Sequence, residues 1–494
     1  MPAADVNAPS ARADCEGGEP TRRRRLRAAV LVLCVVAVLG LYARAAVSYG
    51  KPLAPDREPV FGNFQNPIAD AFLAHQLDLK ITPPPNLLHL RDPYDPIANE
   101  PFRDTGLHDL SLYKGKLYAY FGPAPALLLY IPFRALQIGA LSPAMGTLVF
   151  AALGFLFSLA LFRLIVRWCF GELPTWMHVV AVFTLGLGCP VAWMVYIGRD
   201  YEATIACGYA LLFAGLYCLA RGCLTGSSPV FLALGGLALG LAVAARPSLV
   251  IAAAFVAVAA VLVLRAPQSV RRRSALLVAL LAPYAAVGIL ILLYNQARFG
   301  SFFEFGQSYQ LSLFNPRTYP YDSVSYMPKG LYYYLLSPGR IIADFPYLFL
   351  RKNEYAPALV AQPGFDQYLN EPVAGIFTNM PVTGLGLVLF VTRIRPVTRR
   401  FPKAGVTLLV LTVPALLVLL LLAYRFLGTT MRYELEFAPL LVLASLLGWI
   451  AWSRSRPGTA ITGLGNALWL VALVMSVTFN LAITFTPCVG TGSC

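Results

Sequence analysis

Residues 393–424 read RIRPVTRRFPKAGVTLLVLTVPALLVLLLLAY, a group of basic residues followed directly by a long apolar run. An uncharged apolar segment of about 20 residues is long enough to cross a bilayer as an α-helix. Basic residues gather on the cytoplasmic side of such helices. The segment therefore predicts a membrane-spanning helix at 404–424 whose preceding loop, 393–403, lies inside.

The composition of the whole chain agrees with this interpretation. Of its 494 residues, 58% are hydrophobic and only 13% are charged, which is too few charges for a water-facing surface. The net charge of +15 comes largely from short Arg/Lys clusters between apolar runs. Such clusters are typical of cytoplasmic loops, so we expect an all-α polytopic membrane protein and no nucleic-acid partner.

Apolar length places about eleven spans along the chain. They cover residues 27–48, 144–167, 176–198, 203–221, 229–246, 248–265, 275–296, 373–392, 404–424, 435–453 and 460–486. With the N-terminus inside, the basic clusters all fall on the cytoplasmic side and the C-terminus lies outside. This pattern predicts a multi-pass protein of the bacterial inner membrane.

The spans divide the chain into three regions. We expect a disordered cytoplasmic segment at 1–26, a transmembrane domain at 27–486 and an outer tail at 487–494. Two outer loops, 49–143 and 297–372, are far longer than a helix bundle requires, and long loops are usually functional. Residues 119–138 carry three prolines, so we expect a helix on or re-entering the outer membrane surface there rather than a straight span.

No nucleotide-binding motif occurs, and the four histidines are too scattered to indicate a metal site. Acidic residues are more informative, because carboxylates are costly in lipid. Arg199, Asp200 and Glu202 follow the third span. The two carboxylates could hold an acceptor hydroxyl or a divalent cation such as Mg²⁺ or Mn²⁺, and Arg199 could face a phosphate; the alternative is a solvated helix end.

Two further groups of polar residues are candidates. In the first loop, which also carries Lys116, Asp109 or Asp70 could serve as a general base; the alternative is interfacial anchoring, with lysines meeting lipid phosphates and tyrosines forming an aromatic belt. Arg425 and Arg432 break the positive-inside pattern, which indicates an anion bound outside. A salt bridge from Arg432 to a nearby glutamate of residues 434–436 is the alternative.

Several short sequence segments resemble those of the GT-C superfamily of polyprenyl-phosphate-dependent membrane glycosyltransferases. This superfamily includes protein mannosyltransferases and lipid A aminoarabinose transferases. Residues 68–73, IADAFL, look like the first surface helix of that family, and residues 121–130, FGPAPALLLY, look like its Pro-rich second one. Asp200 and Glu202 match its second acidic site. Residues 244–247, AARP, and 294–301, YNQARFGS, are also similar to bacterial members.

The resemblance implies a bundle with surface helices in the first outer loop. It also implies inverting transfer of a sugar from a polyprenyl-phosphate donor to a lipid, glycan or protein acceptor at the outer membrane face. Asp109 or Asp70 would be the base, Asp200 and Glu202 would orient the acceptor or bind a metal, and Lys116, Arg199, Arg425 and Arg432 would contact the donor phosphate. The family's usual acid just before the first surface helix is missing, since Phe61, Gly62 and Asn63 stand there.

Two other classes of function remain open. A transporter or flippase of lipid-linked glycans would carry broken helices and ionisable residues near the middle of the membrane, and the predicted spans contain almost no acids at that depth. The third hypothesis is a non-catalytic membrane scaffold. The missing acid at 61–63 favours it.

Overall fold

A computed structural model describes residues 21–49, 53–54, 64–319, 324–341, 348–349, 369–425 and 428–485. The predictions for residues 1–20, for the tail at 487–494 and for the missing acid at 61–63 fall outside these residues. The N-terminal helix α1 begins at Thr21, ahead of the predicted boundary at 27.

Within the described residues, nine helical segments are long and apolar enough to cross a membrane. They confirm an all-α polytopic membrane protein. These segments are α1 (Thr21–Tyr49), α6 (Pro143–Cys169), α7 with α8 (Thr175–Leu187 and Val191–Ile197), α9 (Asp200–Leu224), η3 with α11 (Pro247–Ala252 and Ala253–Arg265), α12 (Val270–Phe299), α17 (Pro402–Arg425), α18 (Ala438–Ser455) and α19 (Ala460–Thr484).

The two remaining predicted spans are shorter or broken. Helix α10 (Pro229–Ala245) has 17 residues and packs between α9 and α12. The predicted span 373–392 instead consists of α14 (Ile376–Asn379), the turn η6 (Pro381–Thr383) and α15 (Leu385–Thr392). Pro381 has no backbone N–H and cannot continue the helical hydrogen bonding, so the helix is interrupted here. Just before it, the side-chain amide of Asn379 donates a hydrogen bond to the carbonyl oxygen of Ser337 at 2.8 Å.

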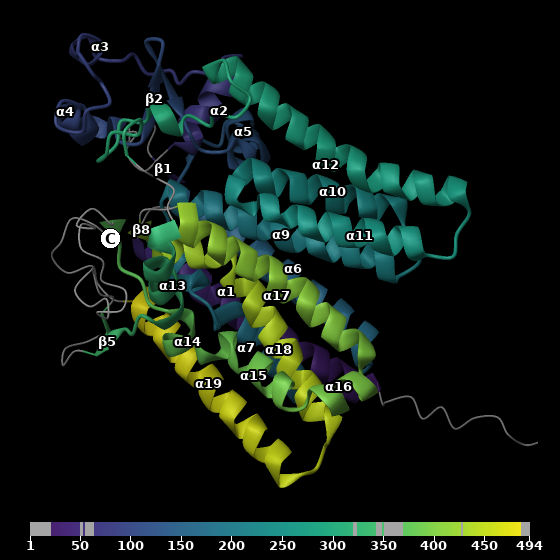
Figure 1. Cartoon of the computed structure of the whole chain (residues 1–494). Coiled ribbons are helices and arrows are strands. Elements are labelled where there is room, and N and C mark those ends of the chain that lie inside the picture. The colour runs from purple at the N-terminus through teal and green to yellow at the C-terminus, as the bar shows by residue number, and fades with distance from the viewer. Residues whose placement is uncertain are drawn as a thin grey trace, which may run out of the picture.

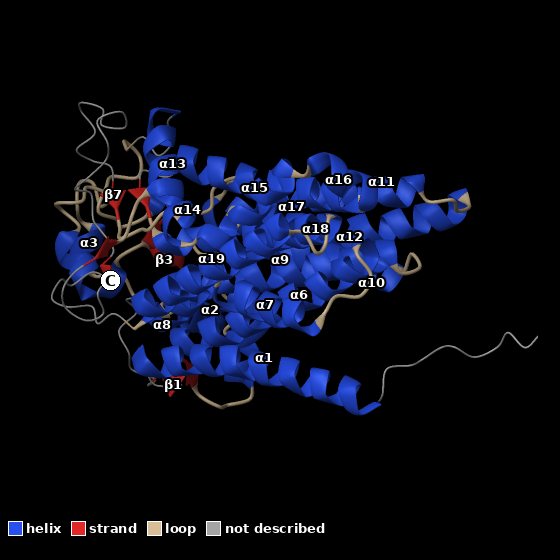
Figure 2. Ribbon diagram, turned by 90° about the horizontal axis from the view of Figure 1, so that it is seen from below, coloured by secondary structure: helices blue, strands red, loops and turns tan. Residues whose placement is uncertain are grey.

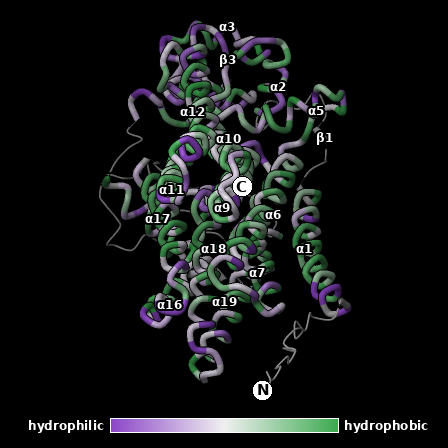
Figure 3. Tube along the Cα trace, turned by 90° about the vertical axis from the view of Figure 1, so that its right-hand side faces the viewer, coloured by the Kyte–Doolittle hydropathy of each residue, from purple (hydrophilic) through white to green (hydrophobic). Residues whose placement is uncertain are grey.

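The helices form two groups around a common core. Figure 1 shows α10, α11 and α12 along one side and α17, α18 and α19 along the other, with α6 and α9 between them. Helix α18 is buried almost throughout, and Trp449 on it stacks on Trp469 of α19 with ring centroids 5.0 Å apart. Figure 3 shows apolar residues along the helices and hydrophilic ones at the ends of the bundle.

The first long loop folds into a small head at one end of the bundle (Figures 1 and 2). Its helical segments are α2 (Gln65–Leu73), α3 (Pro85–Leu88), α4 (Glu100–Phe102), η1 (Arg103–Leu107), η2 (Ala126–Tyr130) and α5 (Ile131–Ala135). Strands β2 (Leu110–Tyr113) and β3 (Lys116–Ala119) form an antiparallel hairpin, and β1 (Leu53–Ala54) pairs with β4 (Ala140–Leu141). The apolar helix Ala126–Ala135 is too short to span, as the prolines predict.

The second long loop and the segment before α18 join the same end. They contain η4 (Gln307–Tyr309), η5 (Val324–Tyr326), α13 (Met327–Leu336), the pair β5 (Arg340–Ile341) and β6 (Leu348–Phe349), the parallel pair β7 (Leu369–Asn370) and β8 (Gly428–Thr429), and η7 (Met431–Glu436). The amide of Leu311 donates to the carbonyl of Leu110 at 2.9 Å, and Leu311 is buried in the apolar core of the head. The two loops therefore form one structure.

Candidate functional site

The candidate site lies where the head meets the bundle. Five parts of the chain contribute. They are the start of β2, the first turn of α9, the junction of α10 with η3, Glu371 directly after β7, and the turn η7. Gly122 allows the head to lie close to the bundle, because any larger residue would place its Cβ atom 1.9 Å from the carbonyl oxygen of Ala244. This approach brings the first loop to the end of α10, next to Arg246.

Asp109 is the residue directly before β2. Its backbone has a φ of 63°, in the left-handed region that Asp tolerates better than most residues. The amide donates to the carbonyl of Leu311 at 2.9 Å, which holds this conformation. The carboxylate accepts a hydrogen bond from the hydroxyl of Tyr201 on α9 and lies 3.7 Å from His108 Nε2. Its side chain is 19% exposed, so it can reach a bound molecule.

Arg432, on η7, is the central cation of the site. It lies 2.8 Å from Glu371 and 3.7 Å from Glu202, and its guanidinium sits 4.9 Å from the centre of the Tyr201 ring. Burial by itself lowers the pKa of Arg432, but Glu371 and Glu202 raise it well above its ordinary value. The side chain therefore stays charged although it is almost enclosed.

A second arginine lies close by. Arg246 pairs with Glu436 at 2.5 Å, and Ser248 donates a hydrogen bond to the other oxygen of that carboxylate. The guanidinium of Arg246 lies 5.1 Å from the centre of the Tyr433 ring, and that of Arg432 lies 5.6 Å from the same centre. Both guanidinium groups thus lie near the same aromatic ring.

Asp200 and Glu202 point to different neighbours. Residues two positions apart on an α-helix face in nearly opposite directions, because each residue turns by about 100°. The buried carboxylate of Asp200 accepts from the amide of Gln65 on α2 at 3.1 Å, whereas buried Glu202 faces Arg432 and accepts from the amide of Arg199. Within the described residues, no group of three or more His, Cys, Asp or Glu side chains could hold a metal ion. The geometry does not fit Asp200 and Glu202 as ligands of one Mg²⁺ or Mn²⁺ ion.

Asp70 and Lys116 pair with residues outside the Arg432 ion pairs. Asp70 pairs with Arg134 at 2.8 Å on the outer side of α2, and exposed Lys116 pairs with Asp78 at 3.0 Å. Arg199 precedes α9, and Arg425 is the last residue of α17. The side chain of Arg425 lies outside the described atoms.

Sequence reasoning did not select Tyr201, Arg246, Glu371 or Glu436 as site residues. Arg246 followed by Pro247 at a helix end was a usable signal, because a second arginine there also breaks the positive-inside pattern. The alternative of a local salt bridge from Arg432 to Glu434 or Glu436 is not what the structure contains. Arg432 pairs with Glu371 and Glu202, and Glu436 pairs with Arg246.

Glu434 is the most unusual acid near the site. It is fully buried, and neither carboxylate oxygen has a hydrogen-bond partner in the described protein atoms. Burial raises the pKa of Glu434 well above its ordinary value, which favours a protonated, neutral side chain.

No family model and no curated protein matches the sequence. Among solved structures, the oligosaccharyltransferase of Archaeoglobus fulgidus in the apo form is similar at 13% identity with a TM-score of 0.49. The same organism's oligosaccharyltransferase AglB, with an inhibitory peptide and a dolichol-phosphate, is similar at 13% identity with a TM-score of 0.43. The matches cover 92% and 94% of this chain but 56% of each of those chains, so this chain spans about half their length.

Proposed function

We propose that this chain is a membrane glycosyltransferase of the GT-C type. It transfers a sugar from a polyprenyl-phosphate donor to a lipid, glycan or protein acceptor, at the outer face of the bacterial inner membrane. The observation that carries the proposal is the position of Asp109, hydrogen-bonded to Tyr201 and close to the Arg432 ion pairs, where the head meets the bundle. A carboxylate base beside enclosed cations is what displacement of a lipid phosphate requires.

Asp109 is the proposed general base. Its carboxylate takes the proton of the acceptor hydroxyl while the acceptor oxygen forms a bond to the anomeric carbon of the sugar. The bond from that carbon to the phosphate oxygen breaks, and polyprenyl phosphate leaves with the electron pair. Attack opposite the leaving group inverts the anomeric carbon. Asp70 remains the less favoured alternative, because it is paired with Arg134.

Arg432 and Arg246 are the proposed contacts of the leaving phosphate. A guanidinium group can donate two parallel hydrogen bonds to two oxygens of a phosphate. Its charge stabilises the leaving phosphate more strongly where water is scarce. The present partner of Arg432, Glu371, has a side chain that is 37% exposed, so a donor phosphate can replace it. Glu202 is buried behind Arg432 and would keep its guanidinium in place. Arg199, Arg425 and Lys116 are proposed as outer phosphate contacts, and Asp200 as the residue that fixes the start of α9 against α2.

The donor proposal is tested by native mass spectrometry of the purified protein with added polyprenyl phosphate. We expect the wild-type protein to retain this lipid and Arg432→Gln to lose it. Arg317→Gln should retain it, because Arg317 is a head residue whose guanidinium stacks on Tyr94. Equal binding by wild-type protein and Arg432→Gln would contradict the proposed phosphate contact.

The transfer proposal needs a turnover measurement. With glycosylated polyprenyl phosphate and membrane extract as acceptor, wild-type protein should release free polyprenyl phosphate. Asp109→Asn should slow this release by about 10²-fold or more, the usual contribution of a general base. Asp104→Asn changes an exposed acid of the same head and should leave the rate unchanged. Donor that binds but is moved across a membrane unchanged would favour a lipid-glycan transporter.

A further inference from the structure

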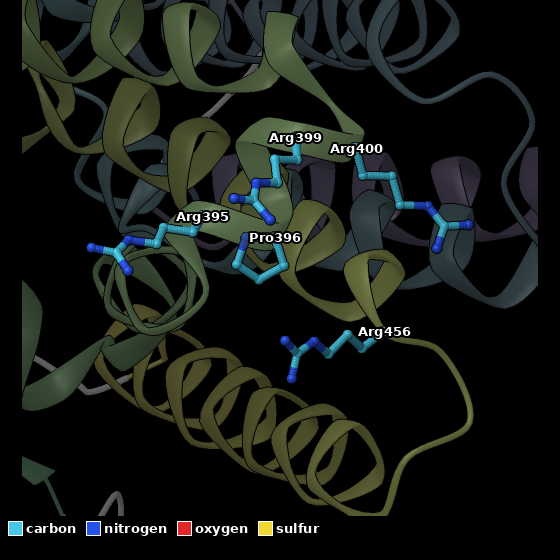
Figure 4. Close-up of a pocket in the computed structure, with 5 residues that line it drawn as sticks. All are labelled: Arg395, Pro396, Arg399, Arg400 and Arg456. Atoms are coloured by element: carbon cyan, nitrogen blue, oxygen red, sulfur yellow. The ribbon is translucent and has the colours of Figure 1, made fainter.

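A pocket lined by arginines lies at the opposite end of the bundle from the candidate site. Arg395, Arg399 and Arg400 of α16 (Ile394–Arg400), together with Pro396 and Arg456, surround a space of about 590 Å³. Figure 4 shows Arg399 and Arg456 on either side of the Pro396 ring, with Arg395 at the edge. Four cationic side chains from two separate segments thus share one hollow.

The charge of this pocket has no local balance. All its lining residues are arginines and one proline, so no acidic side chain among the described residues lines it. Arg395, Arg399, Arg400 and Arg456 are exposed, and among the described residues their side chains make one hydrogen bond, a long one from Arg400 to the carbonyl of Ser455 at 3.5 Å. Like charges held together cost free energy unless an anion joins them.

Two neighbouring arginines outside the pocket lining stabilise the fold instead. Arg393 donates to Thr462 at 2.9 Å and lies over the Trp452 ring, and Arg454 donates to the carbonyl of Glu172 at 2.7 Å. Burial, followed by the charge of nearby Arg456, lowers the pKa of Arg393. The positive-inside tendency accounts for basic residues at this end of the bundle, but not for their arrangement around one hollow while others are used as structural donors.

We propose that this pocket binds the phosphate of an anionic phospholipid headgroup. Guanidinium groups match phosphate oxygens in a bidentate manner, and basic pockets between membrane helices suit such headgroups. A lipid is favoured over a soluble phosphate because the helices that lead away from the pocket expose apolar side chains. Val388 and Val391 of α15, and Ile461, Leu464 and Leu468 of α19, are 48–67% exposed and can contact acyl chains.

The proposal is tested by titrating the purified full chain with short-chain cardiolipin, phosphatidylglycerol and phosphatidylcholine, using native mass spectrometry. Wild-type protein should retain the two anionic lipids over phosphatidylcholine. The triple variant Arg395→Gln, Arg399→Gln, Arg456→Gln should lose affinity for them on the order of 100-fold, the effect of removing three arginines from a headgroup site. The matching triple lysine variant should lose less, because it keeps the charge but not the paired donors.

The control removes the same charge from the same end of the bundle. Arg167, Arg265 and Arg271 are exposed and lie outside the pocket, so their change to Gln should leave lipid affinity near that of wild type. Equal losses in both triple variants would show a general charge effect and overturn the proposal. Displacement of the lipid by millimolar inorganic phosphate would assign the pocket to a soluble anion instead. A loss of lipid binding counts only for variants whose thermal unfolding temperature matches that of wild type, and the lysine variant serves if the Gln variant unfolds.

Discussion

The hydroxyl of Tyr201, in the first turn of α9, donates a hydrogen bond to Asp109, 92 residues earlier in the chain. The Tyr201 ring also lies beneath the guanidinium of Arg432. One side chain thus contacts both the proposed base and the proposed phosphate contact, and its two contacts use different parts of the residue.

Replacing Tyr201 by Phe separates those contacts. The ring stays beneath Arg432, but the hydrogen bond to Asp109 is lost. Hydrogen bonds to charged groups contribute about 1.5–3 kcal/mol, so we expect sugar transfer to slow by about 10- to 100-fold. Binding of polyprenyl phosphate, measured by native mass spectrometry, should stay near the wild-type level. A variant that loses donor binding and transfer together would show that the hydroxyl positions the whole site.

The ion pair of Arg246 with Glu436 should be important for stability. Removing one member of a buried pair leaves the other charge without a partner, at a cost of about 3–5 kcal/mol. We expect Arg246→Gln to lower the unfolding temperature, and the double variant Arg246→Gln, Glu436→Gln to recover much of the loss. Arg265→Gln, an exposed arginine, should be neutral. A double variant that is no more stable than Arg246→Gln would rule out coupling between the two residues.

Glu434 gives the protein a predictable response to pH. Because burial raises its pKa above the ordinary value of 4.5, the folded state binds a proton that the unfolded state has released. Stability from this group is therefore complete below pH 4.5 and falls as pH rises toward the folded pKa. Glu434→Gln is neutral at every pH, so it should be more stable than wild type at pH 8 and similar to it at pH 4. Parallel melting curves across this range would contradict a buried neutral carboxyl.

The predicted orientation of the chain can be tested in living cells. The head and helix α16, whose arginines line the pocket, lie at opposite ends of the bundle (Figure 3). Reporter fusions after Gln310 should be active outside the cytoplasm, and fusions after Thr398 should be active inside. The reverse pattern would invert the topology and move the proposed transfer site to the cytoplasm.

The sequence predicted most of the long helices but not the contacts between them. Apolar length predicted the positions of α6, α9, α12 and α17 within a few residues, because a bilayer needs a fixed length of helix. The break at Pro381 was missed since the flanking residues are apolar enough to suggest one span. Proline in the middle of that run was the signal that could have revealed it.

The site was only partly visible in the sequence, for a similar reason. Asp109, Glu202 and Arg432 could be selected as charges near predicted membrane edges, but nothing local pairs them. Arg432 bonds to Glu371, 61 residues away, rather than to the glutamates beside it. Helical periodicity could have separated Asp200 from Glu202, since positions two apart face different sides. Contacts across long loops depend on how the loops fold together, which one sequence does not reveal.

The pairing of Asp109 with Leu311 has a consequence for the order of biosynthesis. The amide of Asp109 is held by a carbonyl that the ribosome adds only after α12 has been made. Because a membrane protein emerges from its N-terminus onward, strand β2 must wait with an open edge while α6 to α12 enter the bilayer. A nascent chain that stalls before Leu311 already contains Asp109 and Tyr201. It lacks the hydrogen bond from the amide of Asp109 to the second loop. The proposed catalytic base is therefore completed late, once most of the bundle is already in the membrane.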